Sequence, residues 1–194
     1  MLGRRQSIAI GIGIVTVSIV GGWIWSNASD NGNTDTITIN TDDTSKEPGI
    51  GTNTPNQGRN VPTASLTNQN GDEVSTGDIV GRPTVLNFWY STCEPCRREM
   101  PAFQAAHQKF GDRVRFIGIN PQDTADTAAS FADKYGVTYE LWRDNDGKLT
   151  GKIGVATFPA TFFVDATGKI VLQYGGELTS DALNAAIENA FGLK

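Results

Sequence analysis

The chain has 194 residues, which is enough for one domain of about 130 to 140 residues with its own core and an appendage. Its 21 acidic and 16 basic residues give a formal net charge of -5 at pH 7. This composition lacks the basic surface that nucleic acid requires, so we expect no nucleic-acid partner.

The first predicted element is a membrane-spanning segment. The run Ile8–Trp25 holds 18 residues without a charge, close to the roughly 20 apolar residues that cross a bilayer. Arg4 and Arg5 precede the run and favour the cytoplasmic side. We therefore expect residues 1–26 to hold the chain in the cell membrane by a single pass, with the rest on the extracytoplasmic side. A cleaved signal peptide is the alternative, because Ser26–Ala28 is a passable cleavage site.

Residues 27–60 are rich in Asn, Thr, Asp and Gly and have almost no apolar side chain to bury. Such a composition cannot supply a packed core, so we expect a disordered polar linker. The folded domain is then expected to occupy residues 61–194.

The domain shows an α/β pattern. A turn at Asn70–Gly71 between two short extended pieces predicts a β-hairpin, and the apolar run Pro83–Tyr90 predicts a strand buried on both faces. The other expected elements, in chain order, are a helix ending at Gly111, a strand at Val114–Asn120, a helix at Thr124–Tyr135, a hairpin of Ala160–Asp165 and Ile170–Tyr174, and a helix from Thr179 to Phe191. This order predicts a thioredoxin-like α/β fold: a central mixed β-sheet flanked by helices, with an N-terminal β-hairpin extension.

The two cysteines of the chain, Cys93 and Cys96, lie at the junction between a predicted strand and the following helix. A zinc site is disfavoured, because four Cys or His ligands are usual and the chain adds one histidine. Attachment of c-type haem is excluded, because Arg97 follows the second cysteine. A static disulfide stays open as an alternative outside the cytosol, although so short a loop gains little stability.

A redox pair accounts for more of this pattern. Cys93 falls at the start of the helix, where free N–H groups and the helix dipole stabilise a thiolate. Pro95 fits the first helical turn. Cys96 lies one turn inside and is more covered, so we expect Cys93 to attack a disulfide and Cys96 to resolve the mixed disulfide. Glu94 puts a negative charge beside Cys93 and disfavours its thiolate.

From Val61 to about Phe191 the chain resembles the membrane-anchored thioredoxin-like proteins of the ResA/TlpA family. The motifs that carry the resemblance are VLNFW followed by CEPCRREMP, and the later segment DNDGKLTGKIGVATFPATFFVDATGKIV. Tyr90 and Thr92, just before the first cysteine, depart from the common pattern. The resemblance implies a thiol-disulfide oxidoreductase, and we expect no cofactor.

The resemblance also implies roles for single residues. Pro159 is expected to be a cis-proline beside the cysteines, and Phe158 to form a ledge on which a substrate peptide docks, with Glu94 and Pro95 also in contact with substrate. Glu99 has the spacing of a family glutamate that lies by the active site. There, partial shielding would raise its pKa and couple it to the sulfurs.

Four further polar residues accompany the motif. Asn87 holds the place of the buried aspartate of thioredoxins proper. His107, the single histidine, is expected to pack or to stay partly exposed rather than to catalyse. Arg97 and Arg98 are expected to form a solvated helix face, although their charge favours a Cys93 thiolate.

The expected function is the reduction of disulfides in exported proteins. Glu94 and Pro95 between the cysteines favour a milder thiolate than that of strong oxidants, hence a lower potential. The resemblance implies a membrane thiol donor of the CcdA/DsbD type and, as substrate, the oxidised cysteine pair of apocytochrome c. Two alternatives stay open: a disulfide oxidase for exported proteins, and a peroxiredoxin-like peroxidase. The proline and threonine that approach a peroxidatic cysteine are not found before Cys93.

Overall fold

The computed structural model describes residues 52–193. The predicted membrane segment Ile8–Trp25 and most of the predicted linker lie outside the described residues. Among the residues that are described, no helix is both long enough and apolar enough to cross a bilayer.

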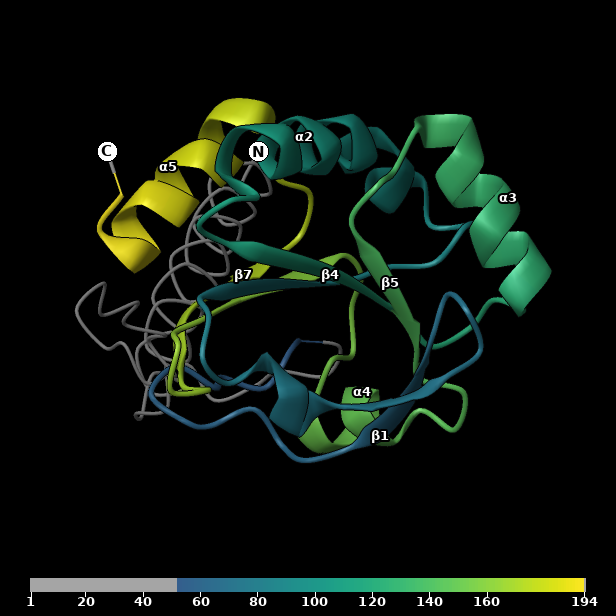
Figure 1. The fold of residues 1–194 in the computed structure, drawn as a ribbon, viewed down its shortest axis with the longest axis horizontal. Helices are drawn as coiled ribbons and strands as arrows, with labels where there is room; N and C mark the ends of the chain where they lie inside the picture. Colours follow the sequence, from purple (N-terminus) through teal and green to yellow (C-terminus); the bar gives the residue numbers. More distant parts are fainter. Residues whose placement is uncertain (1–51, 194) are drawn as a thin grey trace, which may run out of the picture. The chain divides into compact units, whose positions relative to one another are not determined.

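Residues 52–193 form a mixed, seven-stranded sheet with helices on both faces (Figure 1). In chain order the elements are β1 (Ser65–Asn68), β2 (Glu73–Ser75), the 3-10 helix η1 (Thr76–Ile79), β3 (Thr84–Phe88), α2 (Glu94–Phe110), β4 (Arg115–Asn120), α3 (Ala125–Tyr135), β5 (Glu140–Arg143), α4 (Lys148–Ile153), β6 (Ala160–Val164), β7 (Ile170–Gly175) and α5 (Ser180–Phe191). The strand order is β2-β1-β5-β4-β3-β6-β7. Strands β3, β4 and β5 are parallel and the other pairings are antiparallel. The predicted mixed sheet and its N-terminal hairpin are confirmed.

The central strand β3 is buried along its whole length. Its side chains alternate between two apolar clusters: Val85 joins the cluster with α2, α3 and α5, whereas Leu86 and Phe88 join the cluster with α4. Figure 1 shows α2, α3 and α5 on one side of the sheet and α4 on the other. Packing on both faces holds β3 in place. The loop that follows it, which carries the cysteines, therefore starts from a fixed position.

The ends of the predicted helices are confirmed by their caps. The side chains of Thr124 and Thr179 accept hydrogen bonds from the first turns of α3 and α5. Gly136 ends α3 in the left-handed region, with a φ of 62°. Strand β5 and helix α4 were not predicted.

The predicted disordered linker is wrong over residues 52–60. The N–H of Thr54 donates to the carbonyl of Gly154 at 2.9 Å, and the buried Asn56 donates from Nδ2 to the carbonyl of Ile153 at 2.7 Å. Further along, Asn60 forms a β-bridge with Lys169. Polar hydrogen bonds rather than apolar contacts hold this segment, so its composition did not predict its order. We call Thr52–Gln57 the N-terminal strap.

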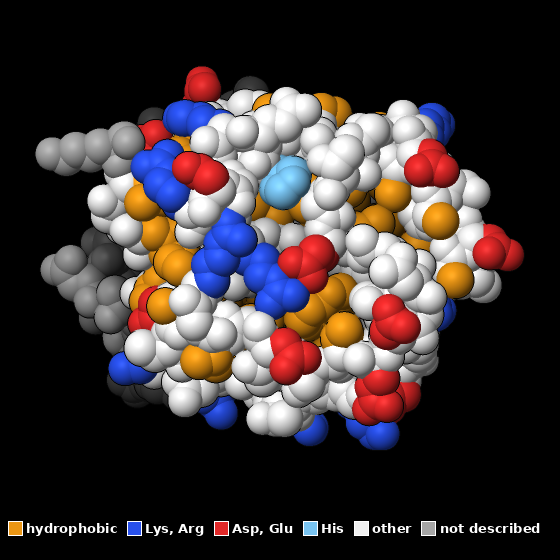
Figure 2. All heavy atoms as spheres, in the orientation of Figure 1, with side chains coloured by type: hydrophobic (Ala, Val, Ile, Leu, Met, Phe, Trp, Pro, Cys, Tyr) orange, Lys and Arg blue, Asp and Glu red, His pale blue; other side chains and the backbone are white. Residues whose placement is uncertain are grey.

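The molecular surface in Figure 2 carries acidic and basic side chains side by side. Ion pairs join some of them, as between Arg115 Nε and Glu140 Oε1, which are 2.6 Å apart. A face with both signs intermixed has no strong field of one sign and gives no electrostatic selection for a polyanion.

Candidate active site

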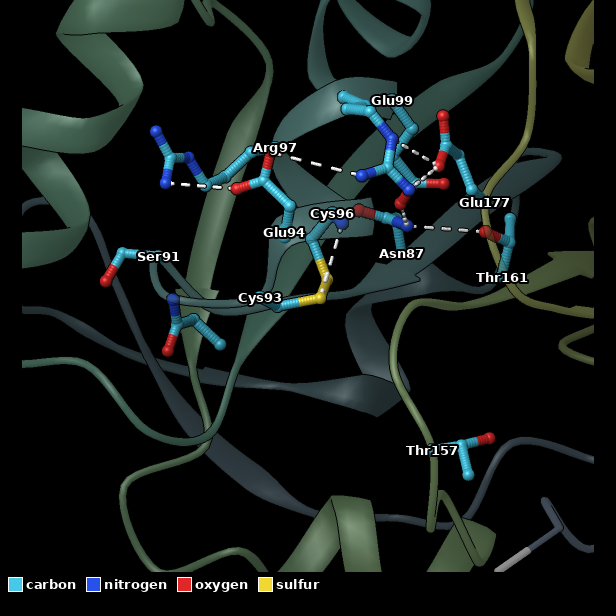
Figure 3. The surroundings of a disulfide bond; sticks show 12 residues. Asn87, Ser91, Cys93, Glu94, Cys96, Arg97, Glu99, Thr157, Thr161 and Glu177 are labelled. Carbon is cyan, nitrogen blue, oxygen red and sulfur yellow. Dashed lines mark hydrogen bonds and ion pairs between the residues drawn. A yellow bond between two sulfur atoms is a disulfide. The ribbon is translucent and has the colours of Figure 1, made fainter.

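The two cysteines form a disulfide at the N-terminus of α2 (Figure 3). Cys93 is the residue that caps the helix, and its Sγ accepts a hydrogen bond from the N–H of Cys96 at 3.3 Å. Pro95 occupies the first turn, where its missing N–H costs nothing. Cys93 is 5% exposed and Cys96 is fully buried. This is the order of exposure that the predicted attacking and resolving roles require.

The loop before Cys93 is held by a carboxylate from the neighbouring strand end. Asp123 accepts two hydrogen bonds from Ser91, one from its N–H and one from its hydroxyl, each at 2.7 Å. Asn120, the last residue of β4, donates to the same carboxylate at 2.7 Å. These residues were not predicted. Their signal was the position of Asn120 and Asp123 just after a parallel strand, at the sheet edge where α/β proteins place their chemistry.

Glu94 lies between the cysteines in sequence but is exposed and paired with cations. Its Oε2 lies 3.2 Å from Arg97 Nη1, and its Oε1 lies 3.9 Å from Arg98 Nη1. Arg97 also donates to the hydroxyl of Tyr135 at 3.3 Å, and Arg98 Nη2 lies 2.6 Å from Glu177 Oε2. Both arginine side chains are at least partly exposed, as expected, and they form surface ion pairs as well. The arginines offset the negative charge that Glu94 brings to the cysteines.

Glu99 lies on the buried face of α2, one turn after Cys96, and is 1% exposed. Its Oε1 accepts a hydrogen bond from Asn87 Nδ2 at 2.8 Å, and its Oε2 accepts one from the N–H of Leu178 at 3.1 Å. The pKa of Glu99 is raised to about 7, mainly by burial and to a smaller extent by the charge of Glu177, although both hydrogen bonds favour the ionised form. The expected rise in pKa is confirmed, and the burial is deeper than the partial shielding predicted.

Asn87 connects this carboxyl group to the sheet. It pairs in register with Thr161 across β3 and β6, and its Nδ2 lies 3.3 Å from the hydroxyl of that residue. Figure 3 shows Asn87 between Thr161 and Glu99. Because an amide does not titrate, Glu99 is the titratable group of this cluster.

The peptide bond between Phe158 and Pro159 is cis, as the resemblance implied. The half-buried ring of Phe158 meets the ring of Tyr90 edge-on, with 5.1 Å between centroids. The carbonyl of Tyr90 in turn accepts a hydrogen bond from the N–H of Cys93 at 3.2 Å. The loop before β6 thus contacts the segment that carries the disulfide.

His107 packs within the domain, as expected. Its ring lies 5.6 Å from that of Phe116 and 5.9 Å from that of Tyr139, and burial lowers its pKa. Over residues 52–193 no group of three or more His, Cys, Asp or Glu side chains is placed to hold a metal ion.

Comparison with known proteins identifies the family. The model described as "AhpC/TSA family" matches residues 57–173. The chain belongs to the AhpC/TSA family. Within this family it is similar to the thiol-disulfide oxidoreductase ResA of Bacillus thuringiensis (strain Al Hakam), with 30% identity over 132 residues, 68% of this chain and 76% of the relative.

Two solved structures are also similar to the chain. One is a Chlorobium tepidum protein assigned as thiol:disulfide interchange protein DsbE, with 26% identity and a TM-score of 0.64 over 71% of this chain and 99% of that one. The other is MTB dsbF, with 26% identity and a TM-score of 0.61 over 66% and 94%. The chain is therefore a ResA-like thiol-disulfide oxidoreductase with a thioredoxin-like fold.

Proposed function

We propose that the protein reduces disulfides of exported proteins, such as apocytochrome c, through Cys93 and Cys96 on the extracytoplasmic side of the membrane. The observation that carries the proposal is that the disulfide caps α2 while the carboxyl group of Glu99 lies buried one turn further along the same helix. A dithiol that reacts by losing protons needs a titratable group nearby to accept them. A static disulfide has no such need.

The reaction proceeds in two exchanges. The Cys93 thiolate attacks one sulfur of the substrate disulfide, which forms a mixed disulfide and releases the first substrate thiolate. Cys96 then loses its thiol proton to the Glu99 carboxylate and attacks the sulfur of Cys93. This step forms the Cys93–Cys96 disulfide and releases the second substrate thiolate. Two electrons from a membrane thiol donor of the CcdA/DsbD type regenerate the dithiol.

Glu99 suits the role of proton acceptor for Cys96. With a pKa of about 7 it is ionised in an appreciable fraction of molecules near neutral pH and can be reprotonated there. The hydrogen bonds from Asn87 and from the N–H of Leu178 hold the carboxyl group beside the helix. Because both donors are neutral, they orient the group without fixing its charge.

The direction of electron flow follows from the charges around Cys93. The helix N-terminus and the N–H of Cys96 favour the thiolate, while no basic residue lies between the cysteines. We expect a mild thiolate and a reduction potential nearer the thioredoxin end of the scale, about -270 mV, than the DsbA end, about -120 mV.

Two experiments on the soluble domain test the proposal. The reduction potential is measured by equilibration with glutathione and dithiothreitol buffers; a value near the oxidising end would favour the disulfide oxidase instead. Substrate trapping tests the roles of the sulfurs: Cys96→Ser should accumulate a mixed disulfide and Cys93→Ser should not. Equal trapping by both variants contradicts the assignment.

The proposed location rests on the apolar run Ile8–Trp25 and the arginines before it. We expect a C-terminal alkaline phosphatase fusion, which is active only beyond the membrane, to be active in cells. Activity of a cytoplasmic reporter fused at the same place contradicts this topology. A mature chain that begins at Ser29 would replace the anchor with a cleaved signal peptide.

The peroxidase alternative has a direct assay. A peroxidatic cysteine is oxidised by hydrogen peroxide to a sulfenic acid, whereas a disulfide reductase reacts far faster with a disulfide. We expect the reduced domain to reduce a peptide disulfide at a rate at least about a hundredfold above its rate with peroxide, which is the effect of about 2.7 kcal/mol in barrier height.

A further inference from the structure

An open groove of about 710 Å³ lies beside the Phe158–Pro159 loop. The N-terminal strap Thr52–Gln57 borders it on one side; Phe158 and the Gly175–Gly176 turn at the end of β7 border it on the other. Its lining residues, all within the described part of the chain, carry no ionisable side chain. The resemblance implies a substrate ledge at Phe158, but the proposed function gives the strap no role.

Asn53 fixes the loop that leads to this ledge. Its Oδ1 accepts hydrogen bonds from the N–H groups of Ala156 and Thr157, both at 2.8 Å, and its Nδ2 donates to the carbonyl of Thr157 at 3.2 Å. This is the donor and acceptor pairing that a neighbouring strand would make with the same backbone. The residues directly before Phe158 are therefore held by a side-chain amide. Thr157 is among the residues drawn around the disulfide in Figure 3.

A second amide clamps the strap to β7. Gln173 accepts from the N–H of Asn56 at 2.9 Å and donates to the carbonyl of Thr54 at 3.0 Å. Thr54 also approaches Gly154 so closely that a Cβ on that glycine would lie 2.1 Å from its hydroxyl oxygen. The strap is thus fixed along its length, and the groove has two firm walls.

We propose that the N-terminal strap is the outer wall of the substrate-binding groove, and that Asn53 is the positioning residue that sets the ledge. The occupant is an extended, uncharged polypeptide segment that flanks the substrate disulfide. The inference rests on the proposed function, and it adds the site that binds the polypeptide on either side of the substrate disulfide.

The residues that line the groove determine the kind of segment that it binds. Main-chain and amide groups of the strap offer hydrogen bonds to an extended backbone, and the rings of Pro55 and Phe158 offer apolar contact. With no ionisable side chain in the groove, neither an acidic nor a basic segment gains a partner there, and a buried charge is costly. The ring of Phe158 contacts Tyr90, whose carbonyl accepts from the N–H of Cys93, so one wall of the groove contacts the segment that carries the disulfide.

The test is a single-turnover oxidation of the reduced protein, with the strap present, by a peptide that contains one disulfide flanked by Ala, Ser and Val, at varied peptide concentration. Loss of the Asn53 bonds frees the ledge. We expect Asn53→Ala to raise the half-saturating concentration about tenfold, the effect of about 1.4 kcal/mol, and to change the maximal rate by less than about twofold. The rate with hydroxyethyl disulfide, which has no flanking chain, should not change.

Two further variants control for folding. Asn53→Asp keeps the acceptor oxygen and loses the donor, so its half-saturating concentration should lie between those of wild type and Asn53→Ala. Asn145→Ala removes an exposed amide that bonds to Thr67 on β1 and should match wild type. Thermal unfolding confirms that each variant folds.

The outcomes separate the two proposals. If the wild-type domain reduces the peptide and Asn53→Ala has the wild-type half-saturating concentration, the role of the strap is refuted and the proposed function stands. An equal loss with peptide and hydroxyethyl disulfide also refutes it, because the effect would then lie at the sulfurs. If wild type reduces no peptide disulfide at all, the proposed function falls, and the groove proposal falls with it.

Discussion

Replacing Glu99 with Gln should remove part of the pH dependence of the free energy of unfolding. The pKa of Glu99 is raised from 4.5 to about 7 in the folded protein. Between these values the folded state keeps a proton that the unfolded state has released, so the free energy of unfolding falls as pH rises. The slope reaches about 1.4 kcal/mol per pH unit, and the whole loss is about 3 kcal/mol by pH 8. Stability from this group is complete below pH 4.5 and lost above pH 7.

The assay is urea unfolding of the oxidised domain from pH 4 to 8.5, in wild type and in Glu99→Gln. The variant stays neutral, so its advantage over wild type should grow by about 3 kcal/mol between pH 4.5 and 8. His107, whose lowered pKa has the opposite effect, contributes to both proteins and cancels in the difference. The charged and titratable neighbours Glu177 and Tyr139 are also common to both.

A surface glutamate supplies the matched control for that experiment. Glu188 is partly exposed and pairs with Lys109 at 3.2 Å; because an exposed ion pair is worth at most about 1 kcal/mol, the difference between Glu188→Gln and wild type should vary by less than that over the same pH range. If the difference for Glu99→Gln is equally flat, the buried carboxyl group titrates as an ordinary one and its role as a proton acceptor near neutral pH is refuted.

Two other substitutions have clear expected results. Glu94→Gln should shift the reduction potential by less than about 15 mV, half the 30 mV of a tenfold change, because exposed arginine pairs already offset its charge; a larger shift contradicts that compensation. Gly118→Ala should lower the free energy of unfolding by about 1 to 3 kcal/mol, since its Cβ would lie 2.7 Å from Trp89 Nε1 and 2.8 Å from Leu141 Cδ2. Gly151→Ala, where nothing lies within 4 Å, is the control in the same urea assay.

The elements with strong local signals could be predicted from the sequence. The apolar run around β3 and the caps Thr124, Gly136 and Thr179 specify their elements without help from the rest of the fold. Strand β5 has four residues, too few to show a period. Helix α4 begins at Lys148, and its N-cap Gly147 has no side chain to accept a capping hydrogen bond, so this short helix has no start signal.

In the candidate site, too, some features could be predicted from local sequence signals and others depend on the folded domain. The spacing of Glu99 from Cys96 predicts a shared helix face, but its depth depends on Leu178, which lies far along the chain and donates to it. The ordered structure of the strap was not predicted, for a related reason. Asn53 and Asn56 read as linker residues by composition, and their order comes from backbone groups that only the folded domain presents to them.

Charged and uncharged side chains lie in different parts of the site. Exposed charges on α2 pair with one another, Glu99 is buried behind the disulfide, and the groove beside Phe158 carries no ionisable side chain. The residues that line that groove offer a substrate segment no ionisable side chain, whereas the proposed mechanism passes the Cys96 proton to Glu99, whose pKa is about 7. Within the proposed function, pH therefore acts on both exchanges, through the Cys93 thiolate in the first and through Glu99 in the second, and leaves the contacts in the groove unchanged. In that proposed mechanism the chain around the substrate disulfide determines binding, and the protonation state of Glu99 determines how readily Cys96 attacks the mixed disulfide.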